Sequence, residues 1–243
     1  MISLLHATRW RPDQARQVRQ VWFDQAADVS RIEHLFAFDD DDEESRGALF
    51  SFPHVLTKPP GSCVAAWNAA AAACRGSVLV QLSDDWYPPK FWDQEIFNRI
   101  GNPYESKVLA VSDGKRKDRL LCMAILTRKR YENQGWMFCP EYLGLWSDNE
   151  FTLRAYQDAV IVSAPDLVFE HRHALYTPEV LPDRTYLHQN SAERRRQGRE
   201  TFLRRNPGGL EFFQPDHAGL HRHDAVAILS NLRNKLASKR KAT

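Results

Sequence analysis

Apolar residues form short runs, separated by more polar stretches, along the first hundred residues of the chain. Short apolar runs bounded by turn residues are typical of buried strands. We predict such strands at residues 2–7, 32–38 and 77–82. The stretches between them are rich in alanine or have apolar residues at helical spacing, which is typical of helices packed on a sheet. We predict helices at residues 13–27, 61–74 and 88–100, and a loop at 53–61. This alternation predicts an α/β fold, a three-layer α/β/α sandwich around a mostly parallel, Rossmann-like sheet.

The pattern changes after residue 105, where the apolar runs become shorter and less regular. We predict strands at residues 108–111, 120–127, 159–163 and 166–169, and a helix from 147 to 156 or 157. From residue 176 the chain is polar and basic, and its apolar spacing predicts helices at 192–205 and 223–237. We therefore expect one α/β domain over residues 1–175 and a basic helical extension over 176–243 that packs on it or extends from it.

The composition limits the class of protein. The net charge of +2 over 243 residues is nearly balanced, which excludes a generic polyanion binder. Four cysteines lie far apart without a CxxC pair, so we expect buried free thiols in a reducing compartment. Nowhere do about 18 apolar residues follow one another, so no transmembrane segment is predicted. We expect a soluble, cytoplasmic protein, with peripheral attachment to a membrane surface as an alternative role of its terminal helix.

Acidic residues follow two of the predicted strands at the point where each strand ends. Asp39 and Asp40 close the second strand, and Asp84 and Asp85 come directly after the third. In parallel α/β sheets, ligands bind beyond the carboxyl ends of the strands. A solvated acidic turn and a helix cap are the common structural explanations for such residues. Their shared position at one edge of the sheet favours a ligand site instead.

Carboxylates and a late histidine match the ligands of a hard divalent cation. Mg²⁺ and Mn²⁺ prefer oxygen ligands, commonly one or two carboxylates with phosphate oxygens and water, and imidazole also binds Mn²⁺. Asp85 with His171 or His173 would supply such ligands. Because these two histidines alternate along a predicted strand, we expect only one of them to face the site. Asp148, at the start of a predicted helix, is the candidate general base, with helix capping as its alternative role.

The order of these features resembles that of the GT-A-fold glycosyltransferases, especially the large inverting family 2. Thr8-Arg9-Trp10-Arg11-Pro12 is similar to the end of that family's opening strand, and Ser83-Asp84-Asp85 is similar to its metal-binding DxD motif. Gly135-Trp136-Met137 and the later Asp148-Asn149-Glu150 resemble the stretch that carries its catalytic base. Val168-Phe169-Glu170-His171 resembles its late strand ending in a histidine. The resemblance covers about residues 1–175.

The resemblance implies transfer of a sugar from a nucleotide-diphosphate donor to an acceptor hydroxyl, with inversion and with Mn²⁺ or Mg²⁺ as cofactor. It favours a UDP-sugar as donor and leaves an anionic glycan, a lipid-linked sugar and a nucleic acid open as acceptors. It makes Asp148 the base, and Asp85 and His171 the metal ligands. Donor contacts are implied for Thr8, Arg9, Arg11, Asp39, Asp40, Asn68 and Asp84.

Two departures from the family pattern leave other functions open. Ser83 stands in place of the first DxD acid, and Ser147 stands where the family usually has an acid before the base. One alternative is a degenerate GT-A domain that binds nucleic acid or envelope components through its basic tail. Another is a nucleotidyltransferase, which would need a glycine-rich phosphate loop after the first strand. The chain has Thr8-Arg9-Trp10-Arg11-Pro12 there, without glycine.

Overall fold

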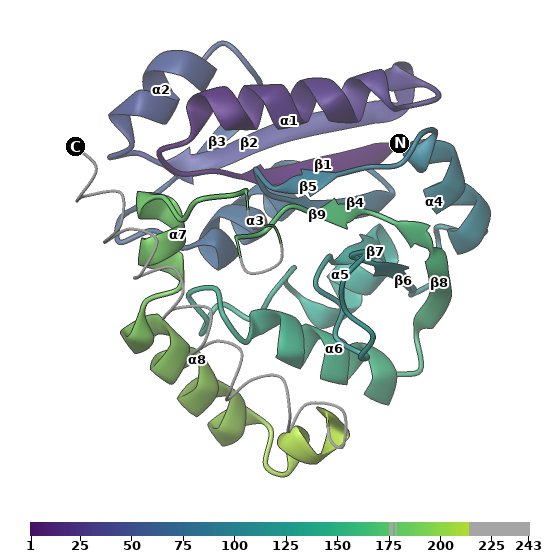
Figure 1. The fold of residues 1–243 in the computed structure, drawn as a ribbon. Coiled ribbons are helices and arrows are strands. Elements are labelled where there is room, and N and C mark those ends of the chain that lie inside the picture. Colours follow the sequence, from purple (N-terminus) through teal and green to yellow (C-terminus); the bar gives the residue numbers. More distant parts are fainter. Residues whose placement is uncertain (175–176, 178, 214–243) are drawn as a thin grey trace.

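A central β-sheet organises the part of the chain that the computed structural model describes, which is residues 1–174, 177 and 179–213 (Figure 1). The strands of this sheet are β1 (Ile2–Ala7), β2 (Ile32–Asp39), β3 (His54–Thr57), β4 (Val78–Leu82), β6 (Val108–Ser112), β7 (Ile125–Thr127) and β8 (Ile161–Val168). Their order across the sheet is β3-β2-β1-β4-β7-β6-β8. Two short strands, β5 (Trp86–Tyr87) and β9 (Glu170–His171), pair beside it as an antiparallel ribbon.

Most strands of the sheet run in the same direction. Neighbours among β1, β2, β3 and β4 are parallel, and β6 is parallel to β8. Only β7, of the described strands in this sheet, is reversed, because it pairs antiparallel with both β4 and β6. The mostly parallel sheet with helices on both faces confirms the predicted α/β fold class.

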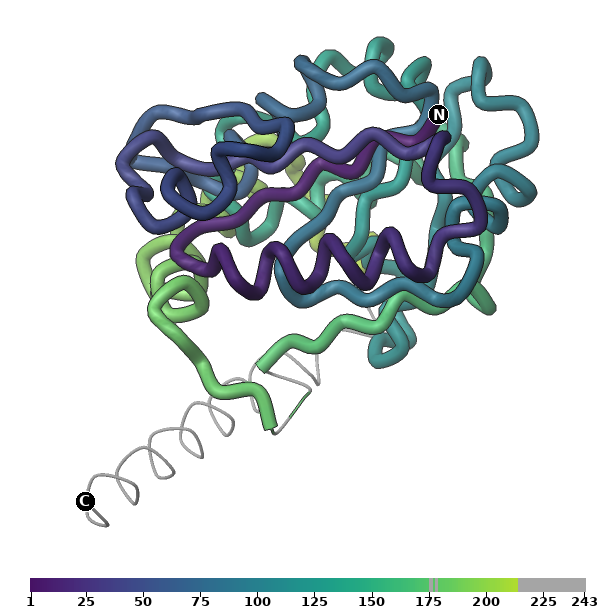
Figure 2. Tube along the Cα trace, turned by 90° about the horizontal axis from the view of Figure 1, so that it is seen from above, coloured from purple at the N-terminus to yellow at the C-terminus, as the bar shows by residue number. Residues whose placement is uncertain are grey.

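Helices cover both faces of the sheet. On one face lie α1 (Pro12–Asp24), α2 (Glu43–Leu49) and α4 (Trp92–Ile100), and on the other lie α3 (Cys63–Ala73), α5 (Arg128–Gln134) and α6 (Ser147–Gln157). Figure 2 shows α1 lying along β1, with the chain of β5 and β9 beside it. This arrangement leaves the carboxyl ends of β1, β2 and β4 at one edge, where loops meet.

The two faces follow from the alternation of side chains along each strand. On β1, Ile2 and Leu4 pack with Trp22 of α1, whereas Leu5 and Ala7 pack in the core against α3. The alanines of α3 let that helix lie close to the sheet, and several of them are fully buried. Every residue of β1 is buried, so β1 is held as a rigid strand in the middle of the molecule.

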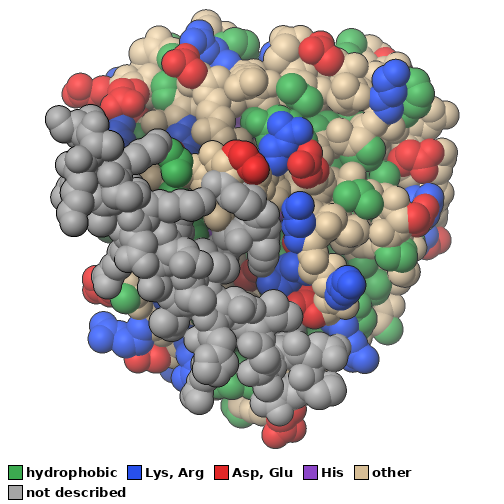
Figure 3. Space-filling model, viewed as in Figure 1, with side chains coloured by type: hydrophobic (Ala, Val, Ile, Leu, Met, Phe, Trp, Pro, Cys, Tyr) green, Lys and Arg blue, Asp and Glu red, His purple; other side chains and the backbone are tan. Residues whose placement is uncertain are grey.

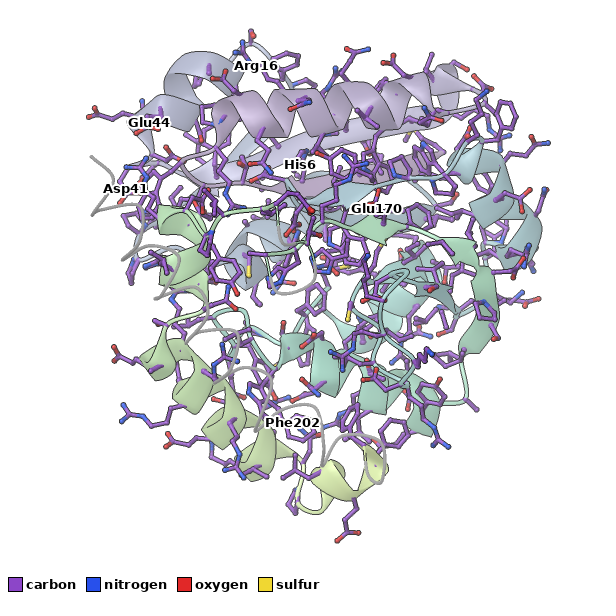
Figure 4. The ribbon with its side chains drawn as sticks, viewed as in Figure 1. His6, Arg16, Asp41, Glu44, Glu170 and Phe202 are labelled. Carbon is purple, nitrogen blue, oxygen red and sulfur yellow. The ribbon has the colours of Figure 1, made fainter. Side chains whose placement is uncertain are left out.

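The described part of the extension packs on this domain. It contains α7 (Arg184–Gln189), α8 (Ala192–Arg205) and a 3₁₀ turn, η2 (Gly209–Phe213). Phe202 of α8, labelled in Figure 4, is fully buried and belongs to the same apolar cluster as Phe151 and Leu153 of α6. No helix among the described residues is long and apolar enough to cross a membrane. The domain boundary at residues 175 and 176 stays a prediction.

Several predicted elements match the structure to within a few residues at their ends. The strands at 2–7, 32–38 and 77–82 and the helices at 13–27, 61–74, 147–157 and 192–205 are present. The helix predicted at 88–100 begins only at Trp92, and the strands predicted at 159–163 and 166–169 form one strand, β8. The helix predicted at 223–237 lies outside the described residues.

Other predictions of local structure were wrong. The predicted loop at 53–61 contains β3, which pairs in parallel with β2 at the edge of the sheet. The predicted strand at 120–127 is only Ile125–Thr127, because the N–H groups ahead of it bond to side chains, although the Ala124 carbonyl still accepts from the Gln81 N–H of β4. There the N–H groups of Leu121 and Ala124 donate to the Thr152 hydroxyl and the Gln81 amide oxygen. The helices α2, α5 and α7 and the 3₁₀ turn η1 (Val29–Arg31) were not predicted.

Candidate active site

A cavity of about 240 Å³ opens at the carboxyl ends of β1, β2 and β4. The other walls come from the segments before β7 and α6, from the end of β9 and from α7. It is lined by these residues of the predicted site: Thr8, Arg9, Arg11, Asp39, Asp84, Asp85, Asp148 and His171. Residues 140 positions apart in the sequence therefore meet at one place, as expected for a ligand site beyond parallel strands.

Two other predicted site residues lie outside this lining. Asn68, on α3, accepts hydrogen bonds from the N–H groups of Met137 and Phe138 and donates one to the Phe138 carbonyl. Its amide thus holds the chain ahead of α6 instead of facing the cavity. Asp40 is exposed just beyond the end of β2, and only Asp39 is turned into the cavity. The structure gives neither residue a direct position in the site.

The acidic turn, which we define as Ser83-Asp84-Asp85, directs its two carboxylates to opposite sides. Asp84 points toward β1, where its oxygens bond to His6 Nε2 at 2.9 Å and to the Thr8 hydroxyl at 3.0 Å. Asp85 points toward β9, where its Oδ2 lies 3.3 Å from His171 Nε2. Asp84 is only 2% exposed and has both oxygens occupied, so Asp85 is the acid of this turn that is available to a ligand.

Backbone contacts fix the acidic turn at both ends. The indole N–H groups of Trp67 and Trp22 donate to the carbonyls of Leu82, at 2.9 Å, and Trp86, at 2.8 Å. The Gln14 side chain donates to the Asp84 carbonyl at 2.7 Å. The Asp85 carbonyl accepts from the N–H of Arg172 at 2.8 Å. Because these donors come from α1, α3 and the end of β9, the turn is held by three separate elements.

Asp85 and His171 form a pair whose environment favours the ionised acid. Pairing of β5 with β9 sets Trp86 opposite His171, and their rings stack with centroids 4.1 Å apart. Burial alone would raise the pKa of Asp85, but the neighbouring His171, together with His173 and Arg11, lowers it to about 2. Asp85 Oδ1 and His171 Nδ1 are buried, and neither has a hydrogen-bond partner among the described residues.

His173 also lines the cavity, so the expectation that only one of the two histidines would face it was wrong. The reason is that β9 ends at His171, and strand alternation no longer applies two residues later. The rings of His171 and His173 are 5.0 Å apart. Burial and the neighbouring His171 lower the pKa of His173 to about 4, so its imidazole is neutral at physiological pH.

The donor atoms of this corner fit a small divalent cation. A buried carboxylate oxygen without a partner beside an imidazole is the kind of set that Mn²⁺ or Mg²⁺ accepts when phosphate oxygens and water complete its coordination. The described residues contain no group of three or more His, Cys, Asp or Glu side chains arranged as a metal site. Asp85 and His171 are therefore the residues of this corner that would hold such an ion.

Asp148 begins α6 on the other side of the cavity. Burial raises the pKa of its carboxyl group. The residue before the helix, Trp146, has a left-handed backbone with φ of 76°, which for a tryptophan costs about 1–3 kcal/mol. Ser147 stabilises this turn by donating to the Gly144 carbonyl at 2.6 Å. A strained turn held in this way is common at functional sites and keeps Asp148 in place.

Arginine–carboxylate pairs form the part of the cavity wall at the ends of β1 and β2. Arg9 pairs with Asp39, whose other oxygen accepts from the Thr57 hydroxyl at 2.6 Å. Arg11 forms two hydrogen bonds of 2.6 Å with Asp183. Gly61 lies so close to Asp39 that a Cβ at this position would be 1.7 Å from its carboxylate. Only glycine fits there, and the approach holds the 61–63 segment against the end of β2.

One wall of the cavity comes from the extension and was missed in the sequence. Thr185, Tyr186, Gln189 and Asn190, on or just after α7, line it. Arg194 of α8 joins this wall to the rest, because its guanidinium donates to the Gln189 side chain and to the carbonyls of Leu143 and Gly61. The sequence signal was the start of α7, where Asp183 caps the helix by accepting from the Tyr186 N–H.

The cysteines are reduced, and two of them face the cavity. Cys63, Cys74, Cys122 and Cys139 are all free thiols. Cys63 and Cys122 belong to the lining, and burial raises the pKa of both, that of Cys63 to about 12. These thiols are therefore protonated at physiological pH and shape the cavity without acting as nucleophiles.

Solved structures of sugar transferases share this arrangement of strands and helices. A mannosyltransferase from Pyrobaculum calidifontis, solved with GDP-Man and Mn²⁺, matches with a TM-score of 0.61. The two sequences are 17% identical, and the match covers 100% of this chain and 75% of that chain. The chain has the GT-A fold.

Two further GT-A structures support the same assignment. Glucosyl-3-phosphoglycerate synthase from Mycobacterium tuberculosis, solved with Mn²⁺, UDP and glucosyl-3-phosphoglycerate, matches with a TM-score of 0.55 and 14% identity over 84% of this chain and 79% of that chain. The 1–349 part of S. aureus TarS matches with a TM-score of 0.54 and 15% identity over 69% of this chain. The chain spans 59% of that TarS structure. No family model and no curated protein matches the sequence.

Proposed function

We propose that this GT-A protein is a glycosyltransferase that moves a sugar from a nucleoside-diphosphate donor to an acceptor hydroxyl. The observation that carries the proposal is the shared cavity of Asp85 and Asp148. Asp85 lies beside His171 with an unsatisfied buried oxygen, and Asp148 is a half-buried carboxyl whose pKa is raised by desolvation. Sugar transfer needs both chemistries, namely support for a departing diphosphate and a base for the attacking hydroxyl.

Each residue of the cavity then has a separate task. Asp148 accepts the proton of the acceptor hydroxyl as the new bond forms on the face of the sugar opposite the leaving group, which gives inversion. Asp85 and His171 would hold Mn²⁺ or Mg²⁺, and such an ion would supply positive charge to offset the charge of the diphosphate leaving group. Asp39 and Arg9, at the ends of β2 and β1, face the nucleoside and phosphates of the donor.

The fold neighbours suggest which donors to test. Their structures contain UDP, UDP-GlcNAc and GDP-Man, and two of them also contain Mn²⁺. We propose a UDP-sugar first, with a GDP-sugar as the second donor to screen. We propose that α7 and the segment before α6, which line the cavity, bind the acceptor. The family resemblance does not extend to α7 and so does not indicate which acceptor this is.

The proposal predicts metal-dependent donor binding through Asp85. Thermal shift and calorimetry with UDP, GDP and their sugars, each with Mn²⁺ or EDTA, should show stabilisation that depends on both nucleotide and metal. Replacing Asp85 by Asn should abolish the Mn²⁺-dependent part, because it removes the charged ligand. Asp40→Asn, which changes an exposed acid outside the cavity, is the matched control and should bind as the wild type does.

The same experiment separates the proposal from its competitors. If neither nucleotide nor metal stabilises the wild-type protein, the glycosyltransferase assignment is wrong. Metal-dependent nucleotide binding without donor hydrolysis or transfer would instead favour a binding module, which the serine at position 83 makes chemically reasonable. An Asp85→Asn variant that keeps full Mn²⁺-dependent binding would exclude Asp85 as the metal ligand.

A further inference from the structure

A histidine of the central sheet, His6, contacts the acidic turn through Asp84. His6 lies on β1, on the face covered by α1, and is fully buried (Figure 4). Its neighbours on this face of the strand, Ile2 and Leu4, are apolar members of the core. A polar ring at such a position costs free energy unless it has hydrogen-bond partners. Packing of the apolar core alone therefore does not explain why a histidine stands at this position.

Both ring nitrogens of His6 have partners. Nε2 lies 2.9 Å from Asp84 Oδ1, and Nδ1 lies 3.0 Å from His34 Nε2 on the adjacent strand β2. Because an ionised carboxylate only accepts hydrogen bonds, Nε2 must carry a proton and donate to Asp84. The ring is also packed against Phe36, with centroids 4.9 Å apart. Two hydrogen bonds and this ring contact leave His6 a single orientation.

Asp84 is held at two points as a result. The Thr8 hydroxyl, two residues after His6 on the same strand, donates to its other oxygen at 3.0 Å. The carboxylate is therefore attached to the end of β1 by both oxygens, and the next residue, Asp85, projects to the opposite side toward His171. With Asp84 fixed to β1 and the Asp85 carbonyl fixed to Arg172, the Asp85 side chain has little freedom to turn away from the cavity.

We propose that His6 is a positioning residue, which fixes Asp84 so that the acidic turn presents Asp85 to the metal ion. In this arrangement Asp84 binds neither donor nor metal, and its charge serves to anchor the turn. The inference rests on the proposed function, because it assigns Asp85 to the metal. Residues that orient a metal ligand through a hydrogen bond contribute about 10- to 100-fold to metal affinity. Because His6 acts on Asp85 through Asp84, which is not itself a ligand, we expect the lower part of this range.

Binding of Mn²⁺ in the presence of UDP, followed by electron paramagnetic resonance, tests the inference without measuring activity. His6→Ala removes the donor to Asp84 and should weaken Mn²⁺ binding by about 10-fold. His6→Gln places an amide N–H near the position of Nε2 and should restore most of the affinity. Ser3→Ala is the matched control, because it removes a part-buried hydrogen bond to Glu33 and a buried one from the Gly76 N–H at the far end of the same strand.

The outcomes distinguish this inference from the proposed function. Wild-type protein that does not bind Mn²⁺ with UDP would overturn both. Wild-type binding, with folded His6→Ala binding Mn²⁺ as tightly as the wild type does, would overturn the role of His6 alone. Equal loss of affinity in Ser3→Ala would show a general effect of stability and would also contradict the inference. If His6→Ala does not fold, Asp84→Asn takes its place, because it keeps the size of the side chain and weakens the same bond.

Discussion

Asp148 lies where α6 begins, half-buried in the lining of the cavity and preceded by a strained turn. Its replacement by Asn keeps the shape and the local hydrogen bond to the Asn149 N–H but removes the basic oxygen. We expect sugar transfer to fall by about 100- to 10,000-fold, the usual contribution of a general base. Donor binding should remain, because the metal corner lies on the other side of the cavity. A transfer assay together with calorimetry checks both, and full activity in the variant would remove Asp148 as the base.

The same substitution has a predicted effect on stability. Burial raises the pKa of Asp148 in the folded protein above its value in the unfolded chain, so the folded state binds this proton more tightly. The group therefore stabilises the fold at low pH, and this stabilisation is lost as the pH rises through the raised pKa. Asp148→Asn should melt at a higher temperature than the wild type at pH 7. Below the ordinary carboxyl pKa of about 4 the difference should vanish. If Asp148→Asn melts at a lower temperature than the wild type at pH 7, the pKa of Asp148 is not raised in the folded protein.

Single residues of the site were predictable where they lie next to a predicted strand end or helix start. Asp39, Asp85 and Asp148 each follow a strand end or begin a helix, so local patterns indicated that they would meet at one edge. The role of Asp84 was not predictable, because it depends on His6, 78 residues away. Tyr186 and Gln189 were missed because they lie in a short helix whose place against the cavity is decided by contacts of α8.

At the scale of elements, the approach of α8 to the segment before α6 depends on Gly198. A Cβ at this position would lie 2.3 Å from the Leu145 carbonyl oxygen, which is backbone and cannot rotate away. Gly198→Ala should destabilise the protein by about 1–3 kcal/mol through this clash, although alanine favours helices. Chemical denaturation measures the change in the free energy of unfolding.

Gly47 gives the matched control for this prediction. It lies in the middle of α2, it is exposed, and a Cβ there would contact nothing within 4 Å. Gly47→Ala should stabilise the protein by up to about 1 kcal/mol, because only helix propensity changes. If both variants change the free energy of unfolding in the same direction, the close contact between α8 and Leu145 does not limit the side chain at position 198.

Elements were predicted well when burial in the sheet controlled their pattern and poorly when contacts with distant residues did. Strands β1, β2 and β4 are buried on both faces, so their apolar runs were clear. Helix α2 begins in an acidic run that favours a solvated turn, but Asp42 caps it by accepting from the Ser45 N–H. Strand β3 is short and at the edge, with Leu56 exposed, so it lacks the apolar run of a central strand.

At the scale of the whole molecule, Glu150 joins α6 to the end of α8. Its buried carboxylate accepts hydrogen bonds from the Tyr142 hydroxyl at 2.7 Å, Arg205 at 2.8 Å and the Asn206 amide at 3.0 Å. Glu150→Ala leaves the Tyr142 hydroxyl unpaired, while Arg205 keeps Glu141 and Asn206 keeps the Phe202 carbonyl, and it should cost about 3 kcal/mol in the free energy of unfolding. Glu193→Ala, an exposed acid in the first turn of α8, should have almost no effect. Equal stability of the two variants would contradict this joining role.

The basic cluster of the sequence is only partly a surface feature. Arg194 is turned toward the cavity wall, and Arg204 and Arg205 pair with Glu141. The exposed members of the cluster on α8 include Arg195, Arg196 and Arg199. Figure 3 shows acidic and basic side chains interspersed over the described part of one face. The fold class could be predicted from the sequence. The role of the arginines in attaching the extension could not, because it depends on distant partners such as Gly61 and Glu141.

The reversed strand β7 determines which part of the chain is free to vary. Because it runs against β4, pairing Ile125 with Val80, its beginning and not its end lies at the rim of the cavity. The segment that leads into it, with Cys122 in the lining, enters this rim from outside the sheet. Two buried residues anchor this segment, since the Asp113 carbonyl accepts from the His171 N–H and the Leu121 N–H donates to the Thr152 hydroxyl. Insertions or deletions confined to the residues between these two anchors would therefore change how the chain reaches the Cys122 side of the rim while leaving β7 paired in the sheet.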